Sequence, residues 1–146
     1  MLRGISPLVS PELLAILSRM GHGDELVLSD AHFPAESFNS RVLRADGLRI
    51  APLLDAILPL WLLDPYVPTP VFMMAPVSGD SLDADLVASY RAAIERHHPG
   101  TPATEYIPRF DFYDRTRSAF AVLVTGETAK YGNIILKKGV TPPFVG

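Results

Sequence analysis

Residues 10–30 read SPELLAILSRMGHGDELVLSD, and this stretch combines a helix signature with a buried strand. Ser10 is a favourable N-cap, and Pro11 suits the first helical position, where its missing backbone N–H costs nothing. Leucine, isoleucine and methionine then recur at helical spacing, and Gly21 is typical of a helix end. Residues 25–29, ELVLS, have three consecutive apolar residues at their centre and the length of a short strand. The segment predicts a helix from residue 11 that leads through a turn into a strand.

The rest of the chain repeats this alternation. We predict further helices over about residues 49–60, 83–97 and 111–118, and further strands over 41–44, 71–74, 119–125 and 133–136. Alternating helices and strands favour a layered α/β domain. The last two strands are joined by a short connection and could pair antiparallel, so the sheet could be mixed. No repeat or linker divides the 146 residues, and we expect a single domain over 1–146.

Composition argues against several classes of protein. The formal net charge is −3 and the basic residues are scattered, which argues against nucleic acid as a partner. No apolar run approaches the ~20 residues of a membrane span. The chain has no cysteine, which excludes disulfides and thiolate chemistry and agrees with a cytoplasmic location. The mean hydropathy of +0.20 is high for a small monomer, so we expect other subunits to cover part of the surface.

His22 is the first candidate for chemistry, because it stands between two glycines directly after a predicted helix. Flanking glycines let the backbone turn sharply and leave space beside the imidazole for a ligand. An unperturbed histidine titrates near pH ~6.5 and can both take and give a proton. The alternative interpretation is a histidine that only interacts with the helix dipole at the C-terminus.

Polar residues at strand ends are the candidates for binding. Asp30 follows a predicted strand, where α/β folds commonly place ligand-binding groups, although an Asx-turn before Pro34 explains it equally well. Arg109 could donate a fork of hydrogen bonds to a polyhydroxylated ligand, or it could be packed or ion-paired. Tyr131 and Asn133 would face the same side if the chain is extended there, and Gly132 between them would allow a close approach.

Other motifs are weak or missing. The sequence contains no phosphate-binding glycine loop, dinucleotide fingerprint or nucleophile elbow. His97 and His98 are adjacent rather than at metal-ligand spacing, which is typical of a solvated helix end. We therefore predict no metal and no cofactor.

Taken together, the segments resemble the ribose pyranase/fucose mutarotase family, and its fucose branch in particular. The resemblance runs over almost the whole chain. It is carried by residues 2–7, SPELL (10–14), MGHGDE (20–25), SDAHFPA (29–35), RADG (44–47), 53–59, Arg109-Phe110, Phe112-Tyr113, TGE (125–127) and YGNIILKKGV (131–140). Arg109 and the Lys137-Lys138 pair favour the fucose branch over the ribose branch.

The resemblance implies a function and an architecture. His22 would be the catalytic proton donor, and Asp30, Arg109 and the segment Tyr131-Gly132-Asn133 would bind a free monosaccharide, fucose above all. The activity would be the interconversion of α and β anomers. The architecture would be a three-layer α/β/α domain with a mixed sheet, assembled into a homodecamer of two pentameric rings.

One distance bears on this site. If residues 23–30 run extended at ~3.3 Å each, His22 and Asp30 of one chain lie about 25 Å apart, too far for one monosaccharide to bridge. Either the turn at Gly23 folds back or two subunits share each site, and we predict a shared site. The competing interpretations are a ribose pyranase, a sugar-binding protein without catalysis, and a purely structural oligomer.

Overall fold

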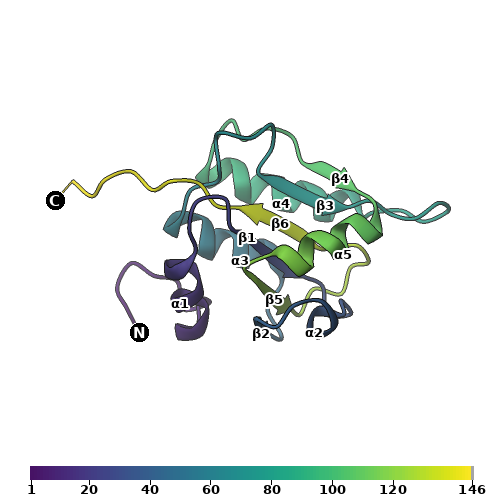
Figure 1. Ribbon diagram of the computed structural model, residues 1–146, viewed down its shortest axis with the longest axis horizontal. Helices are drawn as coiled ribbons and strands as arrows, with labels where there is room; N and C mark the ends of the chain where they lie inside the picture. Colours follow the sequence, from purple (N-terminus) through teal and green to yellow (C-terminus); the bar gives the residue numbers. More distant parts are fainter. Residues whose placement is uncertain (146) are drawn as a thin grey trace.

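Six strands form one mixed sheet in the computed structural model, which describes residues 1–145 (Figure 1). The strands are β1 (Glu25–Ser29), β2 (Val42–Ala45), β3 (Val71–Met74), β4 (Glu105–Ile107), β5 (Ala121–Thr125) and β6 (Ile134–Lys137). Their order across the sheet is β2-β5-β1-β6-β3-β4. The pairs β1–β5, β2–β5 and β3–β4 are parallel, and β6 runs antiparallel to both β1 and β3.

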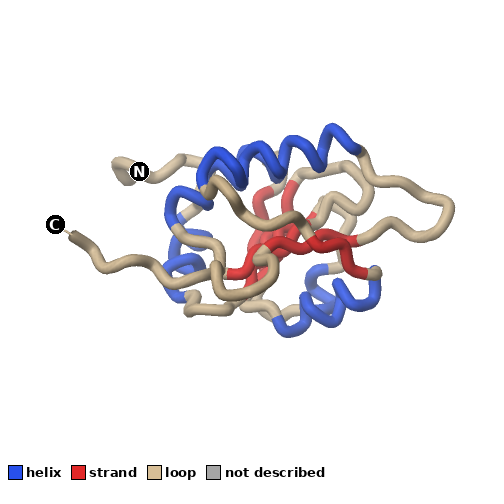
Figure 2. Tube along the Cα trace, turned by 90° about the horizontal axis from the view of Figure 1, so that it is seen from above, coloured by secondary structure: helices blue, strands red, loops and turns tan. Residues whose placement is uncertain are grey.

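Helices cover both faces of this sheet, as Figure 2 shows. The helices are α1 (Pro11–Arg19), α2 (Ala35–Phe38), α3 (Ile50–Ile57), η1 (Leu58–Leu60, a 3-10 turn), α4 (Ala84–His97) and α5 (Arg109–Ser118). Leu26 and Leu28 of β1 pack in the core beneath α1, α3 and α4, whereas Val27 packs on the opposite face with α2 and α5. This alternation is that of a central strand buried on both sides. The expected three-layer α/β/α fold is confirmed.

Local signals predicted most elements well. The side chain of Ser10 caps α1 by accepting a hydrogen bond from the backbone of Leu13, and Asp83 caps α4 in the same manner. The helix predicted over 49–60 ends as an α-helix at Ile57 and continues as the 3-10 turn, because Pro59 cannot donate a helical hydrogen bond. Helix α5 begins two residues earlier than predicted, and the short elements α2 and β4 were not predicted.

The suggested antiparallel pairing of the two C-terminal strands is wrong. Strand β1 lies between β5 and β6, because the connection over residues 126–133 crosses the carboxyl end of β1 instead of forming a hairpin. The backbone N–H of Ala31 donates to the carbonyl of Glu127 at 2.7 Å at this crossing. Residues 131–133 are thereby brought beside Asp30.

The topology gives the sheet two different edges. The parallel strands β1, β2, β3, β4 and β5 all end at one edge, where β6 begins, and ligands of α/β folds commonly bind at such an edge.

Within residues 1–145, no helix has both the length and the apolar character needed to cross a membrane.

Candidate functional site

A cavity of about 310 Å³ opens at the carboxyl ends of the parallel strands. Its lining comes from Asp30, His32, Phe33, Pro34, Met74, Asp80, Arg109, Tyr113, Lys130, Tyr131 and Asn133. Asp30 follows β1, Met74 ends β3, Arg109 begins α5 just after β4, and Asn133 precedes β6. Four of the predicted binding residues, which are far apart in the sequence, therefore meet in one cavity.

Asp30 is almost completely buried at the base of this site, with 6% of its surface exposed. Its backbone N–H donates to Oδ1 of Asn133 at 2.7 Å, and its Oδ1 accepts a hydrogen bond from the backbone of His32 at 2.9 Å. Burial raises the pKa of this carboxyl, and the hydrogen bonds from His32 and Asn133 offset part of that effect. The Asx-turn considered from the sequence is present, and it holds the carboxylate at the cavity.

Tyr131 has a backbone conformation that side chains rarely adopt. Its φ is 58°, the only positive value for a residue other than glycine within residues 1–145. The chain is therefore not extended at Tyr131, the condition under which Tyr131 and Asn133 were expected to face one side, yet both residues line the cavity. The Tyr131 hydroxyl donates to Oδ2 of Asp80 at 3.0 Å. Strained residues of this kind cluster at functional sites.

Gly132 lies behind the cavity rather than in its lining. The hydroxyl of Tyr90 donates to the Gly132 carbonyl at 2.7 Å, and burial together with the Glu127 charge raises the pKa of Tyr90. A Cβ on Gly132 would stand 3.0 Å from the carbonyl oxygen of Ala129. Gly132 is therefore required for packing of this turn, which fixes Tyr131.

Glu127 stabilises the same turn through hydrogen bonds to its buried side chain. Its side chain is 2% exposed, and its Oε1 accepts hydrogen bonds from the backbone of Thr128 and Ala129 and from Arg49. A buried carboxylate with three donors is a strong local anchor. No local pattern in the sequence marks this role of Glu127, because its partners are set by the fold of the turn.

Arg109 occupies the first position of α5 and is exposed at the cavity. Its guanidinium lies 4.9 Å from the centre of the Phe110 ring and forms no ion pair within residues 1–145. The donors of an arginine without a carboxylate partner can bind the hydroxyl oxygens of a ligand.

His22 lies at the opposite edge of the sheet and does not line this cavity. It is not the C-cap of α1, which is Met20. Gly23 has a φ of 84° and donates its N–H to the carbonyl of Lys138 at 2.8 Å, and Oδ2 of Asp24 accepts from the backbone of Gly21 at 2.7 Å. These contacts fix the turn that carries His22 at the amino end of β1.

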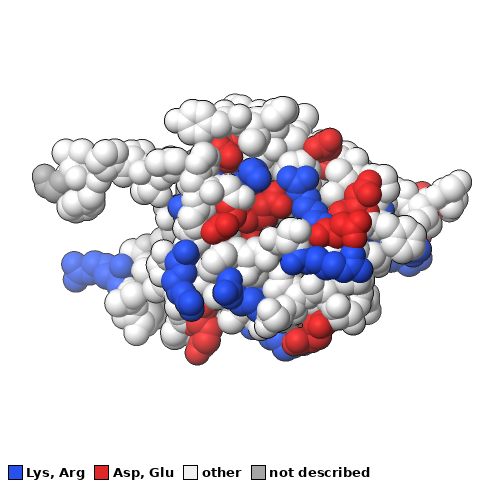
Figure 3. Space-filling model, viewed as in Figure 1, with Lys and Arg blue, Asp and Glu red and all other residues white. Residues whose placement is uncertain are grey.

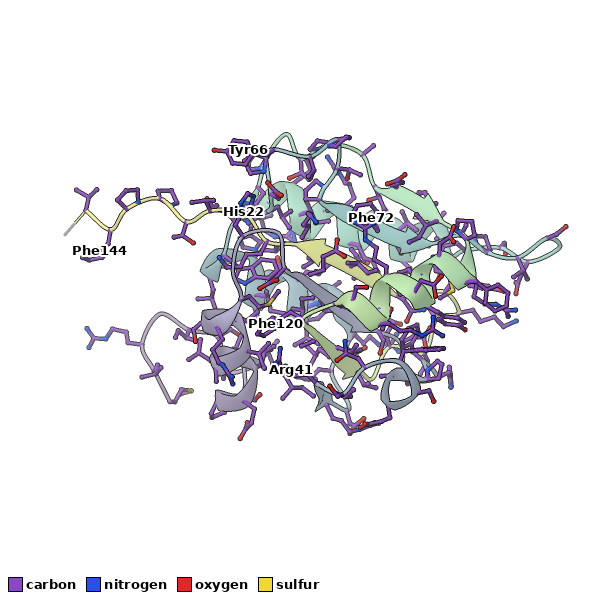
Figure 4. The ribbon with its side chains drawn as sticks, in the orientation of Figure 1. His22, Arg41, Tyr66, Phe72, Phe120 and Phe144 are labelled. Carbon is purple, nitrogen blue, oxygen red and sulfur yellow. The ribbon has the colours of Figure 1, made fainter. Side chains whose placement is uncertain are left out.

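The His22 ring, 48% exposed, lies against a buried carboxylate. Its Nε2 is 3.2 Å from Oδ1 of Asp64, whose side chain is 3% exposed. Oδ1 of Asp64 also accepts from the backbone of Tyr66 at 3.0 Å, and the Tyr66 ring lies edge-on to the imidazole at 5.7 Å between centres (Figure 4). Asp64 was not predicted, because it reaches His22 only through the fold.

Gly139 permits the close backbone packing that places Asp64 beside His22. The backbone N–H of Asp64 donates to the carbonyl of Lys137 at 3.0 Å, so the end of β6 holds both Asp64 and the turn of His22. A Cβ on Gly139 would lie 2.8 Å from the carbonyl oxygen of Leu63. Only glycine fits such a close backbone approach.

The sequence suggested that His97 and His98 mark a solvated helix end, and this interpretation is wrong. His97 forms a hydrogen bond with Oδ1 of Asp55 at 2.9 Å, and Nε2 of His98 lies 3.0 Å from the carbonyl oxygens of Leu58 and Trp61. They join α4 to the end of α3 and to η1. Within residues 1–145, no three His, Asp or Glu residues lie together as metal ligands would.

Charges of both signs are interspersed on the face shown in Figure 3. Glu25 pairs with Arg115 at 2.8 Å and with Lys137 at 3.7 Å, and the Arg115 guanidinium stacks 3.7 Å from the centre of the Phe72 ring. The opposite charges around Glu25 thus neutralise one another locally.

Comparison with known proteins identifies close relatives. The model of the RbsD / FucU transport protein family matches residues 3–141. The L-fucose mutarotase of Actinobacillus pleuropneumoniae serotype 5b is 58% identical over 142 residues, which cover 97% of this chain and 99% of that protein.

Solved structures agree with this relationship. The fucose mutarotase of Streptococcus pneumoniae in complex with L-fucose has a TM-score of 0.91 and 46% identity, over 97% of this chain and all of that one. Bacillus subtilis RbsD complexed with D-ribose has a TM-score of 0.76 at 21% identity, over 97% of this chain and all of that one, which shows a shared fold alone.

Proposed function

This chain belongs to the RbsD / FucU transport protein family, and we propose that it is an L-fucose mutarotase, an isomerase that interconverts the α and β anomers of the free sugar. The observation that carries the proposal is the 58% identity, over nearly the whole length of both chains, to a protein named L-fucose mutarotase. Residues 1–146 form a single mutarotase domain in this proposal, and the enzyme is cytoplasmic and needs no cofactor.

The reaction moves only protons. A base removes the proton of the anomeric hydroxyl while an acid protonates the ring oxygen, and the bond between C1 and the ring oxygen breaks to give the open aldehyde. Rotation about the C1–C2 bond and reclosure, with the two protons returned, give the other anomer. General acid–base catalysis of this kind contributes about 10²–10⁴-fold.

The cavity supplies the binding groups. The buried carboxylate of Asp30 accepts hydrogen bonds from sugar hydroxyls, and the guanidinium of Arg109 donates to their oxygens. The side-chain oxygen of Asn133 orients Asp30 by accepting a hydrogen bond from its backbone N–H, and Tyr131 forms another part of the cavity lining. A neutral polyhydroxylated ligand suits a cavity that has both acidic and basic groups.

His22 acts as the proton donor and acceptor. Its half-exposed ring lies against the buried Asp64, which holds the imidazole in place and leaves its other side open to a ligand. Two candidates remain for the second proton transfer, Tyr131 and a water molecule held by Asp30, and we favour the water because the Tyr131 hydroxyl donates its hydrogen to Asp80.

Each active site is shared between two subunits, because His22 and the cavity lie at opposite edges of one chain's sheet. A largely exposed aromatic ring flanks each half: Tyr66 beside His22 is 76% exposed, and Phe110 beside Arg109 is 67% exposed. Exposed apolar surface of this kind suits a subunit interface. We propose that these two surfaces meet in a homodecamer of two pentameric rings.

A ribose pyranase is the second candidate within the same family. The relative complexed with D-ribose is only 21% identical, whereas the relative complexed with L-fucose is 46% identical. The higher identity to the relative complexed with L-fucose favours fucose.

Saturation-transfer NMR over a panel of reducing sugars tests the proposal. We expect the wild-type protein to accelerate exchange between the α and β signals of L-fucose more than exchange between the pyranose and furanose signals of D-ribose. The reverse preference would establish a pyranase, and binding of L-fucose without faster exchange would establish a sugar-binding protein.

A further inference from the structure

The loop over residues 75–83 contributes one side chain to the cavity. This loop connects β3 to α4 and projects beyond the sheet in Figure 1. Its single residue in the cavity lining is Asp80, whose side chain is 32% exposed. No local sequence pattern marks Asp80, and Asp80 is neither a sugar-binding group nor a proton-transfer group in the function proposed above.

Asp80 is oriented by its own loop and by the opposite wall. Its Oδ1 accepts a hydrogen bond from the backbone of Ser81 at 2.9 Å, and its Oδ2 accepts from the Tyr131 hydroxyl at 3.0 Å. The amine of Lys130 lies 3.9 Å from Oδ2. These contacts lower the pKa of Asp80, so the carboxylate is an ion at neutral pH and only accepts hydrogen bonds.

The hydrogen bond to Asp80 determines whether the Tyr131 hydroxyl can donate a hydrogen bond to a ligand or only accept one. A phenol has one hydrogen to donate, and in this structure Tyr131 gives it to Asp80. The oxygen of Tyr131 keeps its lone pairs, so toward the cavity it can only accept. The packing of Gly132 and the hydrogen bond from Tyr90 to its carbonyl hold the backbone of this turn, and with it the position from which the Tyr131 ring extends.

We propose that Asp80 is a specificity-determining residue of the sugar site, which fixes Tyr131 as a hydrogen-bond acceptor and so selects a sugar with a donating hydroxyl at the position that faces Tyr131. Asp80 acts through Tyr131 and is a positioning residue. The inference rests on the proposed function, because it names how that site reads its sugar.

Fluorinated sugars separate an acceptor from a donor, because a C–F group cannot donate a hydrogen bond. We would measure by calorimetry the dissociation constants of L-fucose and of its 2-, 3- and 4-deoxyfluoro analogues. The proteins are the wild type, Asp80→Ala, Tyr131→Phe and, as a control that removes a nearby exposed carboxylate without touching Tyr131, Asp85→Ala.

We expect the wild type to bind the analogue whose fluorine faces Tyr131 about tenfold more weakly than L-fucose, the size of one lost hydrogen bond. An analogue whose fluorine faces Asp30 also binds more weakly, but equally so in Asp80→Ala. In Asp80→Ala the freed phenol hydrogen can turn toward the ligand, so the ratio for the first analogue falls to about threefold or less. Tyr131→Phe gives the same small ratio, and Asp85→Ala keeps the wild-type ratio. A purely structural role of Asp80 would weaken all four sugars alike and leave the ratio unchanged.

Two results contradict the inference while leaving the proposed function in place. One is an Asp80→Ala ratio equal to that of the wild type, and the other is a wild type that binds all analogues as tightly as L-fucose. If the wild type neither binds L-fucose nor speeds its anomer exchange, the proposed function itself fails, and the role of Asp80 fails with it.

Discussion

At its carboxyl end β1 leads into Asp30 and a cavity, whereas at its amino end it is preceded by His22 and a half-exposed ring. The carboxylate at the cavity is almost buried and its pKa is raised, and around it lie a guanidinium, an amide and two phenols. At the other end one imidazole lies against one buried carboxylate, Asp64.

The difference suggests a division of labour. The cavity end offers many groups that can bind hydroxyls, while the His22 end offers one half-exposed imidazole that can serve as an acid or a base. The proposed proton donor and the proposed binding groups therefore lie at different ends of β1. The substitutions below remove groups at one end of β1 or at both, and the rate of anomer exchange, the affinity for the sugar or the stability is then measured.

The largest effect is expected for His22→Ala. Removal of the imidazole should lower the rate of L-fucose anomer exchange by about 10²–10⁴-fold, while the affinity for the sugar changes only a few-fold. NMR exchange and calorimetry on the same preparation measure the two quantities, and circular dichroism controls for folding. A His22→Ala variant that exchanges anomers at the wild-type rate would remove His22 from the mechanism.

Mixed assemblies test whether the two ends of different chains cooperate. Co-expression of His22→Ala with Asp30→Ala should restore activity to about a quarter of wild type, since random pairing gives that share of sites with both intact halves. The matched control mixes Asp30→Ala with Arg109→Ala. These two residues line one cavity of one chain, so no restoration is expected. Equal recovery in both mixtures, or in neither, would argue against a shared site.

Asp64→Asn should have a smaller effect at the His22 end. The variant removes the charge beside Nε2 of His22, and we expect the exchange rate to fall about tenfold while the affinity for L-fucose is retained. Asp55→Asn is the matched control, because Asp55 contacts His97 in a histidine–carboxylate pair that belongs to neither half of the proposed site. Equal losses in both variants would show a general effect on stability rather than a role for Asp64.

The sequence predicted the elements better than the contacts between them. Helix α1 and strand β1 depend on local signals, namely the cap at Ser10 and the apolar run of residues 26–28. The crossing of residues 126–133 over the end of β1 depends on packing, and it made the suggested pairing of β5 with β6 wrong.

The site divides in the same way. His22, Asp30 and Arg109 stand beside glycines, strand ends or aromatic residues that can be seen in the sequence. Asp80 is 51 positions from Tyr131, and Asp64 is 42 positions from His22, so no local pattern joins either pair. The predicted distance between His22 and Asp30 followed from strand geometry alone. It did not depend on knowing any side-chain contact.

The smallest effect is expected for the change in thermal stability caused by Asp30→Asn. The sign of this change shows whether the carboxylate of Asp30 destabilises the folded protein, as a buried charge would, or stabilises it. Burial raises the pKa of Asp30 in the folded protein above 3.8, so in the pH range just above 3.8 the folded state holds a proton that the unfolded state has lost. Stability of the wild type therefore falls as the pH rises through the folded pKa. Asparagine has no charge to desolvate.

Thermal unfolding should thus give Asp30→Asn a Tm about 2 °C above wild type at pH 7, with the difference vanishing below pH 3.8. Asp46→Asn is the opposite control. Arg44 lowers the pKa of Asp46, so its contribution to stability is present above pH 3.8 and is lost as the pH falls. If Asp30→Asn is the less stable protein at pH 7, the hydrogen bonds to Asp30 outweigh its burial, and the carboxylate is retained for structure rather than for the sugar.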